Sequence, residues 1–322
     1  MTAWIRALWM GLALAGAATV HADTFPSKPI RIVVPFAPGG NVDVTARVMS
    51  AAMTKQLNQT VIVENRVGAG GKIGAEAAIR SPADGYTLMM GSNSSLSVAP
   101  NLYPDWPYDP QTGITPISHL AAVPFVLIVR PGLGAKNLAE LIRLAREKPE
   151  GLSMASAGSG TSNHLVGELF QSATGTRLLH VPFKGAGPAL QEVMAGRVDL
   201  LFDQVSSSSN FIEQGKVIPL AVSSQARWKS LPQVPTFAES GVPDFVITNF
   251  TGLVAPAGLP ADVADTLQRA AVQALQDDAV KKSFASMGVE AVGSTPAQFS
   301  ALIRADFQRW ATVIKAKGIK LN

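Results

Sequence analysis

VVPFAPGGNVD (residues 33–43) joins a β-branched apolar segment to a Pro-Gly-Gly turn and then to a helix-like stretch. Such strand–turn–helix units are typical of α/β proteins, and anions bind at the turn because the first N–H groups of the helix are unpaired. We expect Gly39 and Gly40 to form a turn that needs positive φ, followed by Asn41 as the helix N-cap. Asp43 and Arg47, four residues apart on that helix, are expected to pair with each other.

The same alternation of short β-branched runs and helix-period segments continues along the chain. In the first helix, Val44, Val48, Ala51 and Ala52 are expected to share the inward face. The order predicts a mostly parallel sheet with helices on both faces. Strands are expected at 30–36, 60–64, 86–91, 152–156, 178–183, 198–202, 217–222 and 245–255, and helices at 41–57, 73–80, 137–148, 164–171, 186–195 and within 260–317.

Two strand-to-helix turns have nearly the same wording, VPFAPGG (34–40) and VPFKGAG (181–187). This repetition predicts two similar α/β lobes that face each other across a cleft, where ligands commonly bind. Lobe 1 is expected to comprise residues 23–122 plus 247–322, with lobe 2 (123–246) inserted in it. The alternative is chance similarity between short words in a glycine-rich chain.

Residues 1–22 have the form of a signal peptide, with Arg6 before an apolar segment and small residues before a cleavage point after Ala22. An uncleaved membrane anchor is the alternative, but the fourteen apolar residues at 7–20 fall short of the roughly 20 that span a bilayer. The other 300 residues (322 − 22) contain no cysteine, which suits a bacterial periplasm.

The composition also excludes some partners and cofactors. The 27 Lys and Arg and 23 Asp and Glu residues are scattered, so nucleic acid is not an expected partner. The histidines beyond residue 22 form no metal-binding motif, and no metal or cofactor is expected. GAGGKI (68–73) lacks the third glycine of the dinucleotide-binding fingerprint GxGxxG. It also departs from the P-loop sequence, because Gly71-Lys72 is followed by Ile73 instead of Ser or Thr.

Four glycine or serine turns end strands: APGGN (37–41), GAGG (68–71), GSNSS (91–95) and AGSGTSN (157–163). None contains arginine, so a carboxylate held there would be bound by backbone N–H groups, hydroxyls and ordered water. This arrangement favours reversible capture over catalysis, since no general acid–base pair converges.

Two further residue groups leave alternatives open. A hydrolase would use Ser159 or Ser162 with His164, although the local sequence is not a GxSxG elbow. Asp203 follows a predicted strand, and it either accepts a hydrogen bond from a ligand amine or hydroxyl or caps the next helix at Ser206.

Several sequence blocks, in order, resemble the Bug family of extracytoplasmic receptors of tripartite tricarboxylate transporters. They include FPSKPIRIVVPFAPGG (25–40), VIVENRVGAGGKIGAEAAIRSPADGYTLMMGS (61–92), ASAGSGTSNHLVGELF (155–170) and VPFKGAGPALQEVMAGRVDLLFD (181–203). The resemblance implies a type II periplasmic-binding-protein fold, two α/β lobes with a ligand cleft between them. It also implies a pocket for a small carboxylate made by Phe36, Ala37, Gly39, Gly40, Ser92, Asn93, Ser94, Ser159, Gly160, Thr161, Ser162 and Asp203.

The resulting hypothesis is a monomeric periplasmic solute receptor, without enzymatic activity, that captures a dicarboxylate, an acidic amino acid or an aromatic acid. Its expected partners are the membrane subunits of a tripartite tricarboxylate-type transporter. Phe250 stands where the family often has Trp or Tyr, which leaves the ligand open. The alternatives are a periplasmic hydrolase and a ligand sensor that docks on a membrane kinase.

Overall fold

The computed structural model describes residues 25–319, so the predicted signal peptide (1–22) lies outside the described residues. The strands are β1 (Ile30–Val34), β2 (Val61–Asn65), β3 (Thr87–Ser92), β4 (Ile114–Val129), β5 (Ser153–Ser156), β6 (Leu179–Pro182), β7 (Leu200–Gln204), β8 (Ile218–Val222), β9 (Thr248–Pro256) and β10 (Glu290–Ala291). The helices are α1 (Asn41–Leu57), α2 (Lys72–Ile79), α3 (Ala99–Leu102), α4 (Leu138–Glu147), α5 (Ser162–Thr174), α6 (Ala186–Met194), α7 (Val205–Glu213), α8 (Ala261–Ala274), α9 (Asp278–Ser286) and α10 (Pro296–Lys317), with shorter helical turns at η1 (Ala69–Gly71) and η2 (Ser94–Val98).

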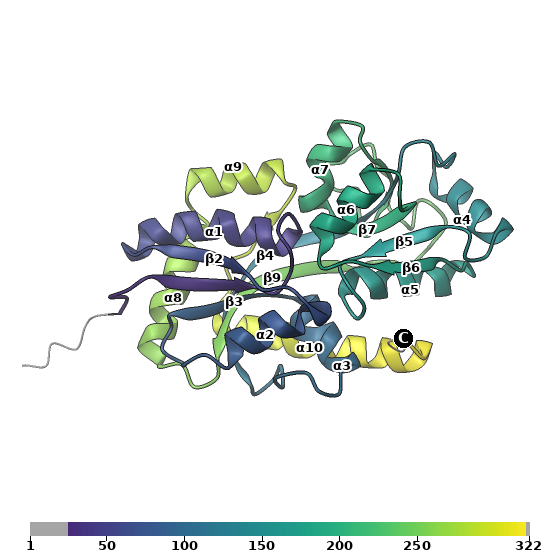
Figure 1. Cartoon of the computed structure of the whole chain (residues 1–322). Coiled ribbons are helices and arrows are strands. Elements are labelled where there is room, and N and C mark those ends of the chain that lie inside the picture. Colours follow the sequence, from purple (N-terminus) through teal and green to yellow (C-terminus); the bar gives the residue numbers. More distant parts are fainter. Residues whose placement is uncertain (1–24, 320–322) are drawn as a thin grey trace, which may run out of the picture.

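The strands form two groups that are joined through β4 and β9 (Figure 1). The group around β1, β2, β3 and β9 is called lobe 1 here, and the group around β5, β6, β7 and β8 is called lobe 2. The sixteen-residue strand β4 belongs to both, because residues 114–124 pair with β9 and residues 125–129 pair with β7. The predicted lobe limits at 122/123 and 246/247 lie close to these crossings and remain a prediction.

The sheet is parallel at its two ends and antiparallel in its middle. β1 pairs parallel with β2 and β3, and β5 pairs parallel with β6 and β7. The pairs β3–β9, β4–β9 and β4–β7 are antiparallel. The predicted parallel sheet is therefore correct within each lobe and wrong at the crossing strands, which carry the chain between the lobes and run in opposite directions.

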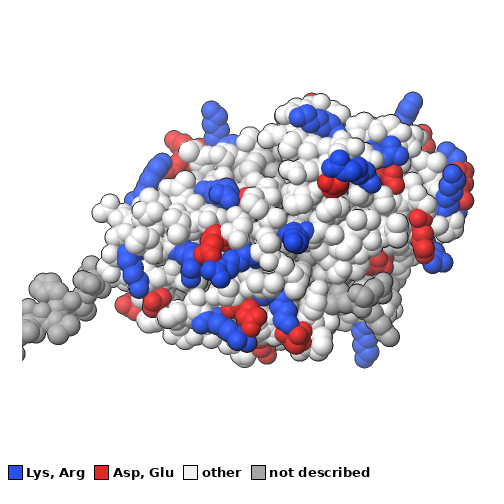
Figure 2. Space-filling model, in the orientation of Figure 1, with Lys and Arg blue, Asp and Glu red and all other residues white. Residues whose placement is uncertain are grey.

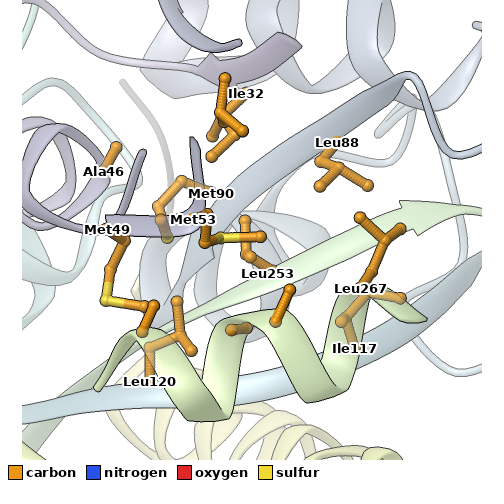
Figure 3. Packing of buried hydrophobic residues seen from close by; sticks show 14 of the residues in the cluster. Ile32, Ala46, Met49, Met53, Leu88, Met90, Ile117, Leu120, Leu253 and Leu267 are labelled. Atoms are coloured by element: carbon orange, nitrogen blue, oxygen red, sulfur yellow. The ribbon is translucent and has the colours of Figure 1, made fainter. Parts of the chain in front are cut away.

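Helix α1 has the predicted bounds, Asn41–Leu57, and its predicted inward face is partly correct. Ala52 lies in the lobe 1 core and Val48 packs against it, whereas Ala51 is exposed. The other core residues of the helix include Val42, Ala46, Met49 and Met53. Figure 3 shows Met49 and Met53 packed toward side chains of the sheet. The methionines decide the face because their long apolar side chains fill the space between helix and sheet.

Helix α10 packs on both lobes, although the sequence assigned it to lobe 1. Phe299 and Ile303 at its beginning lie in a lobe 1 cluster with Phe250. Trp310, further along the helix, lies in the lobe 2 core with Phe170. Figure 1 shows α10 in yellow running beneath both groups of strands.

The charged surface is mixed. Figure 2 shows Lys and Arg side chains interspersed with Asp and Glu over the face in view, in keeping with the scattered charges of the sequence. Among the described helices, none is long and apolar enough to cross a lipid bilayer.

Candidate functional site

A cavity between the lobes is lined by the ends of strands and the beginnings of helices from both sides. Its free volume in this structure is small, about 20 Å³, which is room for about one water molecule. None of the described residues in its wall is Lys or Arg. The wall consists of Phe36, Ala37, Gly40, Asn41, Val42, Asp43, Ser92, Ser94, Ala157, Asn163, Ala186 and Gln204.

Four helices begin at this cavity without a side-chain cap. The N-cap residues of α1, α5, α6 and α7 are Gly40, Thr161, Gly185 and Gln204, and none of these side chains accepts a hydrogen bond from its helix. Among the helices that add no residue to the wall, α4, α9 and α10 are capped by the side chains of Asn137, Asp277 and Thr295, whereas α2 and α8 also lack a side-chain cap. The N-terminal partial charge of the four uncapped helices therefore favours an anion in the cavity.

The turn before α1 differs from the expectation in two ways. Gly39 has the predicted positive φ of 90°, but Gly40 has φ −87° and is itself the N-cap. Asn41 is not the cap, and its side chain reaches across the cleft base. Its Nδ2 donates to Thr251 Oγ1 at 2.9 Å, and its Oδ1 accepts from Ser206 Oγ at 2.6 Å.

Asp43 supports this turn from within α1. Its Oδ2 accepts from the Gly39 N–H and from Arg47 Nε, each at 3.0 Å, and its Oδ1 accepts from Asn65 Nδ2 at 2.8 Å. The predicted pair with Arg47 is confirmed, and this pairing raises the pKa of Arg47. The Asp43 carboxylate is thus fully used in holding the turn, although part of the residue lies in the cavity wall.

The lobes are closed on each other in this structure. Ser94 Oγ of lobe 1 lies 2.8 Å from Ser162 Oγ of lobe 2 and also accepts from the Ser162 N–H at 2.9 Å. Tyr103 Oη donates to the Ser159 carbonyl at 2.9 Å. These contacts bring the serine turn at 91–95 against the glycine turn at 157–163.

The predicted site residues form two groups: those that line the cavity wall, and those that lie around it, which are called frame residues here. Phe36, Ala37, Gly40, Ser92 and Ser94 line the cavity. The remaining seven shape the surrounding turns instead: Gly39, Asn93, Ser159, Gly160, Thr161, Ser162 and Asp203.

Asn93 is an example of a frame residue. Its Nδ2 donates to the Thr248 carbonyl at 3.2 Å, and its Oδ1 accepts from the Phe250 N–H at 2.9 Å. It therefore ties the end of β3 to the crossing strand β9.

Seven wall residues were not expected from the sequence in that role. Val42, Ala157, Asn163, Ala186 and Gln204 were not singled out, and Asn41 and Asp43 were expected to have other roles. Six of the seven lie at or near the beginning of a helix that follows a strand, and Ala157 directly follows strand β5. A position between a strand and the next helix is the signal that could have identified them.

The geometry does not support a serine hydrolase. His164 Nδ1 accepts from the Gly160 N–H at 3.2 Å, and Ser162 Oγ bonds to Ser94 instead of to His164. Burial, together with the neighbouring His180 ring stacked 3.9 Å away, lowers the pKa of His164 to about 3. A histidine with this pKa is a weak base, so it could not activate a serine efficiently.

An unpredicted pair joins Ser156 Oγ and His180 Nε2 at 2.6 Å. Burial lowers the pKa of His180 to about 4, and Ser156 Oγ also accepts from the Gly158 N–H at 3.1 Å. The pair therefore holds the 157–163 turn in place.

Asp203 is fully buried, and only one of its two carboxylate oxygens has hydrogen-bond partners among the described residues. Its Oδ2 accepts from Ser207 Oγ at 2.7 Å and from Ser208 Oγ at 2.5 Å, while Oδ1 has no hydrogen-bond partner in the described part of the chain. It does not cap the helix at Ser206, whose hydroxyl bonds to Asn41. Desolvation raises the pKa of Asp203 to about 6.

This raised pKa predicts a pH-dependent stability that Asp203→Asn should remove. The folded protein keeps a proton on Asp203 that the unfolded chain releases at the ordinary aspartate pKa of 3.8, so the stabilisation is complete below 3.8 and is lost as the pH rises through about 6. The loss amounts to about 3 kcal/mol in the free energy of unfolding. Denaturant unfolding of both proteins at pH 4 and pH 7 measures it.

Because His164 and His180 titrate in the opposite sense, the quantity to compare is the difference between variant and wild type at each pH. The variant should gain about 2 kcal/mol relative to wild type between the two pH values, because the unfolded carboxyl is already partly ionised at pH 4. A difference that does not change with pH would contradict the buried, uncompensated carboxylate.

The chain is similar to several known proteins. The family model described as "Tripartite tricarboxylate transporter family receptor" matches residues 45–319. Protein BugT of Bordetella pertussis is 39% identical over 324 residues, covering 100% of this chain and 99% of BugT. The structure of the periplasmic binding protein BugD has a TM-score of 0.89 at 34% identity, covering 92% of this chain and 99% of BugD.

Two other solved structures contain ligands. A protein of R. palustris with adipate has a TM-score of 0.88 at 33% identity, covering 92% of this chain and 99% of that one. MatC from Rhodopseudomonas palustris with bound malate has a TM-score of 0.87 at 32% identity, covering 90% of this chain and 100% of MatC. With its two-lobe periplasmic-binding-protein fold, this chain belongs to the Bug family of tripartite tricarboxylate transporter receptors.

Proposed function

We propose that this periplasmic solute-binding receptor captures a small dicarboxylate between its lobes and presents it to the membrane subunits of a tripartite tricarboxylate-type transporter. Members of the family are substrate-binding proteins and not enzymes. The ligand would be held at the helix N-termini that line the cavity and by the hydroxyls of Ser92 and Ser94, and it would be released unchanged.

The observation that carries this proposal is the convergence of four uncapped helix N-termini on a cavity without Lys or Arg in its described wall. Such a site binds a carboxylate through main-chain donors and the helix dipoles. The ligands of two relatives, adipate and malate, are both dicarboxylates, and this supports testing that class first.

Thermal shift of the mature protein tests the ligand class. At 100 times its dissociation constant, a ligand adds about 2.7 kcal/mol to the free energy of unfolding. For a chain of this size, this corresponds to a rise of about 4 °C in Tm. We expect this rise with malate, adipate or succinate.

Succinamide is the matched control, because it has the same chain length as succinate without the charges, and it should cause no shift. Acidic amino acids and nicotinate extend the panel to the other ligand classes. A Tm that responds to none of the carboxylates would reject the proposal. NMR of the ligand after long incubation should show the starting compound, whereas a new product would favour the hydrolase.

A further inference from the structure

We propose that the second of the two similar strand-to-helix turns, VPFKGAG (181–187), is the surface on which the 36–40 turn closes. Gly187 is the positioning residue that permits this closure. The inference rests on the proposed function, since it describes how the same site encloses its carboxylate. The contact between the two turns is called the closing seam here, and it consists of residues 37–40 of lobe 1 and residues 184–187 of lobe 2.

The two similar turns lie face to face in the closed structure. The Ala37 N–H of the first turn donates to the Lys184 carbonyl of the second at 3.0 Å. The Gly39 N–H is already bound to Asp43. Two backbone donors of the 36–40 turn are therefore used by the opposite lobe and by helix α1, while Phe36, Ala37 and Gly40 of the same segment line the cavity.

The seam leaves no room for a side chain at Gly187. An added Cβ would lie 2.1 Å from the Pro38 carbonyl oxygen and 3.2 Å from Gly39 Cα. Both neighbours are backbone atoms, which cannot rotate away as a flexible side chain could. The nearest atoms all belong to lobe 1, so this restriction comes from closure and not from packing within lobe 2.

The backbone of Gly187 does not itself require glycine. The residue lies in the first turn of α6 and is not among the glycines with positive φ. Alanine is preferred over glycine in helix interiors by about 1 kcal/mol. Close approach of the opposite lobe is therefore the physical reason for glycine at this position.

Neighbouring positions show the same closeness. A Cβ at Gly185 would lie 2.8 Å from the Ala37 nitrogen, and one at Gly40 would lie 3.2 Å from Ala186 Cβ. The seam is thus a contact of backbone on backbone, and adding one methyl group at Gly187 holds the lobes apart.

Binding and closure can be measured separately in Gly187→Ala. The unliganded variant should keep or raise its Tm, because the added methyl group meets nothing once the lobes separate. Its affinity for malate or adipate, whichever the wild type binds, should fall by at least about tenfold by calorimetry. Gln191→Ala, on the exposed side of the same helix, is the matched control and should bind like wild type.

Closure itself can be reported by a disulfide, since the chain has no cysteine. Ser94→Cys with Ser162→Cys places two thiols where the hydroxyl oxygens are 2.8 Å apart across the cleft. A mild oxidant such as oxidised glutathione takes up the two electrons released as the S–S bond forms, and each thiol loses a proton. Adding Gly187→Ala to this pair should slow the cross-linking by at least about tenfold, with or without carboxylate.

Unchanged affinity or unchanged cross-linking in Gly187→Ala would overturn the closing seam. If no carboxylate binds the wild type, the proposed function fails, but the cross-linking comparison without ligand still tests the seam. A second pair of variants serves if Gly187→Ala does not fold. Gly40→Ala should weaken binding, and Gly40→Ala with Ala186→Gly should restore it, because the second change removes the nearest opposing methyl group. Failure of this rescue would also contradict the seam.

Discussion

Gly40→Val is expected to lower the affinity for the carboxylate by about 100-fold or more while leaving the fold intact. Gly40 has φ −87° and ψ 168°, a conformation that valine adopts without strain, so the backbone is not the cause of the loss. The loss comes from space, because Gly40 lines the cavity and an added Cβ already lies 3.2 Å from Ala186 Cβ. The two methyl groups of valine would occupy the position of the ligand and block closure.

Calorimetry with the dicarboxylate that shifts the Tm of the wild type measures this loss, and circular dichroism checks the fold. Ala51→Val is the matched control, because it places the same side chain at an exposed position of the same helix. It should bind like wild type. Wild-type affinity in a folded Gly40→Val protein would place the ligand elsewhere.

Trp310→Ala is expected to reduce the free energy of unfolding by about 3–5 kcal/mol, the usual cost of emptying a large aromatic site. Trp310 is 1% exposed and packs in the lobe 2 core, whereas Phe299, at the beginning of the same helix, packs in a lobe 1 cluster. The substitution therefore leaves a cavity and also weakens the attachment of α10 to lobe 2.

Denaturant unfolding measures the loss, and two variants serve as controls. Trp310→Phe keeps most of the apolar area and should lose clearly less stability than Trp310→Ala. Gln308→Ala changes an exposed residue of the same helix and should lie within about 0.5 kcal/mol of wild type. A loss below about 1 kcal/mol in Trp310→Ala would mean that α10 is not held by this contact.

Much of the local structure could be predicted from the sequence because it depends on neighbouring residues. The bounds of α1 follow from a helical pattern after a Pro-Gly-Gly turn, and the pairing of Asp43 with Arg47 follows from a spacing of four residues.

Other assignments failed where a residue had a partner far along the chain. Asn41 is of a residue type that is common at helix N-caps, yet its side chain bonds to Thr251, which is 210 residues away along the chain. The bonds from Asn93 to β9 were likewise not visible in the sequence, and its expected contact with a ligand stays a prediction. A side chain with several possible acceptors takes the one that the fold brings near, and the local pattern does not contain that choice.

The sequence by itself determined the strand-to-helix turns, the absence of arginine from four of these turns and the resemblance to a family of receptors, because each of these features lies in contiguous residues. Only the tertiary structure decided that the two similar turns face each other and that α10 packs on both lobes. It also decided that one carboxylate oxygen of Asp203 has no hydrogen-bond partner among the described residues. These features arise from packing between segments distant in the chain, where closeness is set by the closed arrangement of two lobes and not by sequence neighbours.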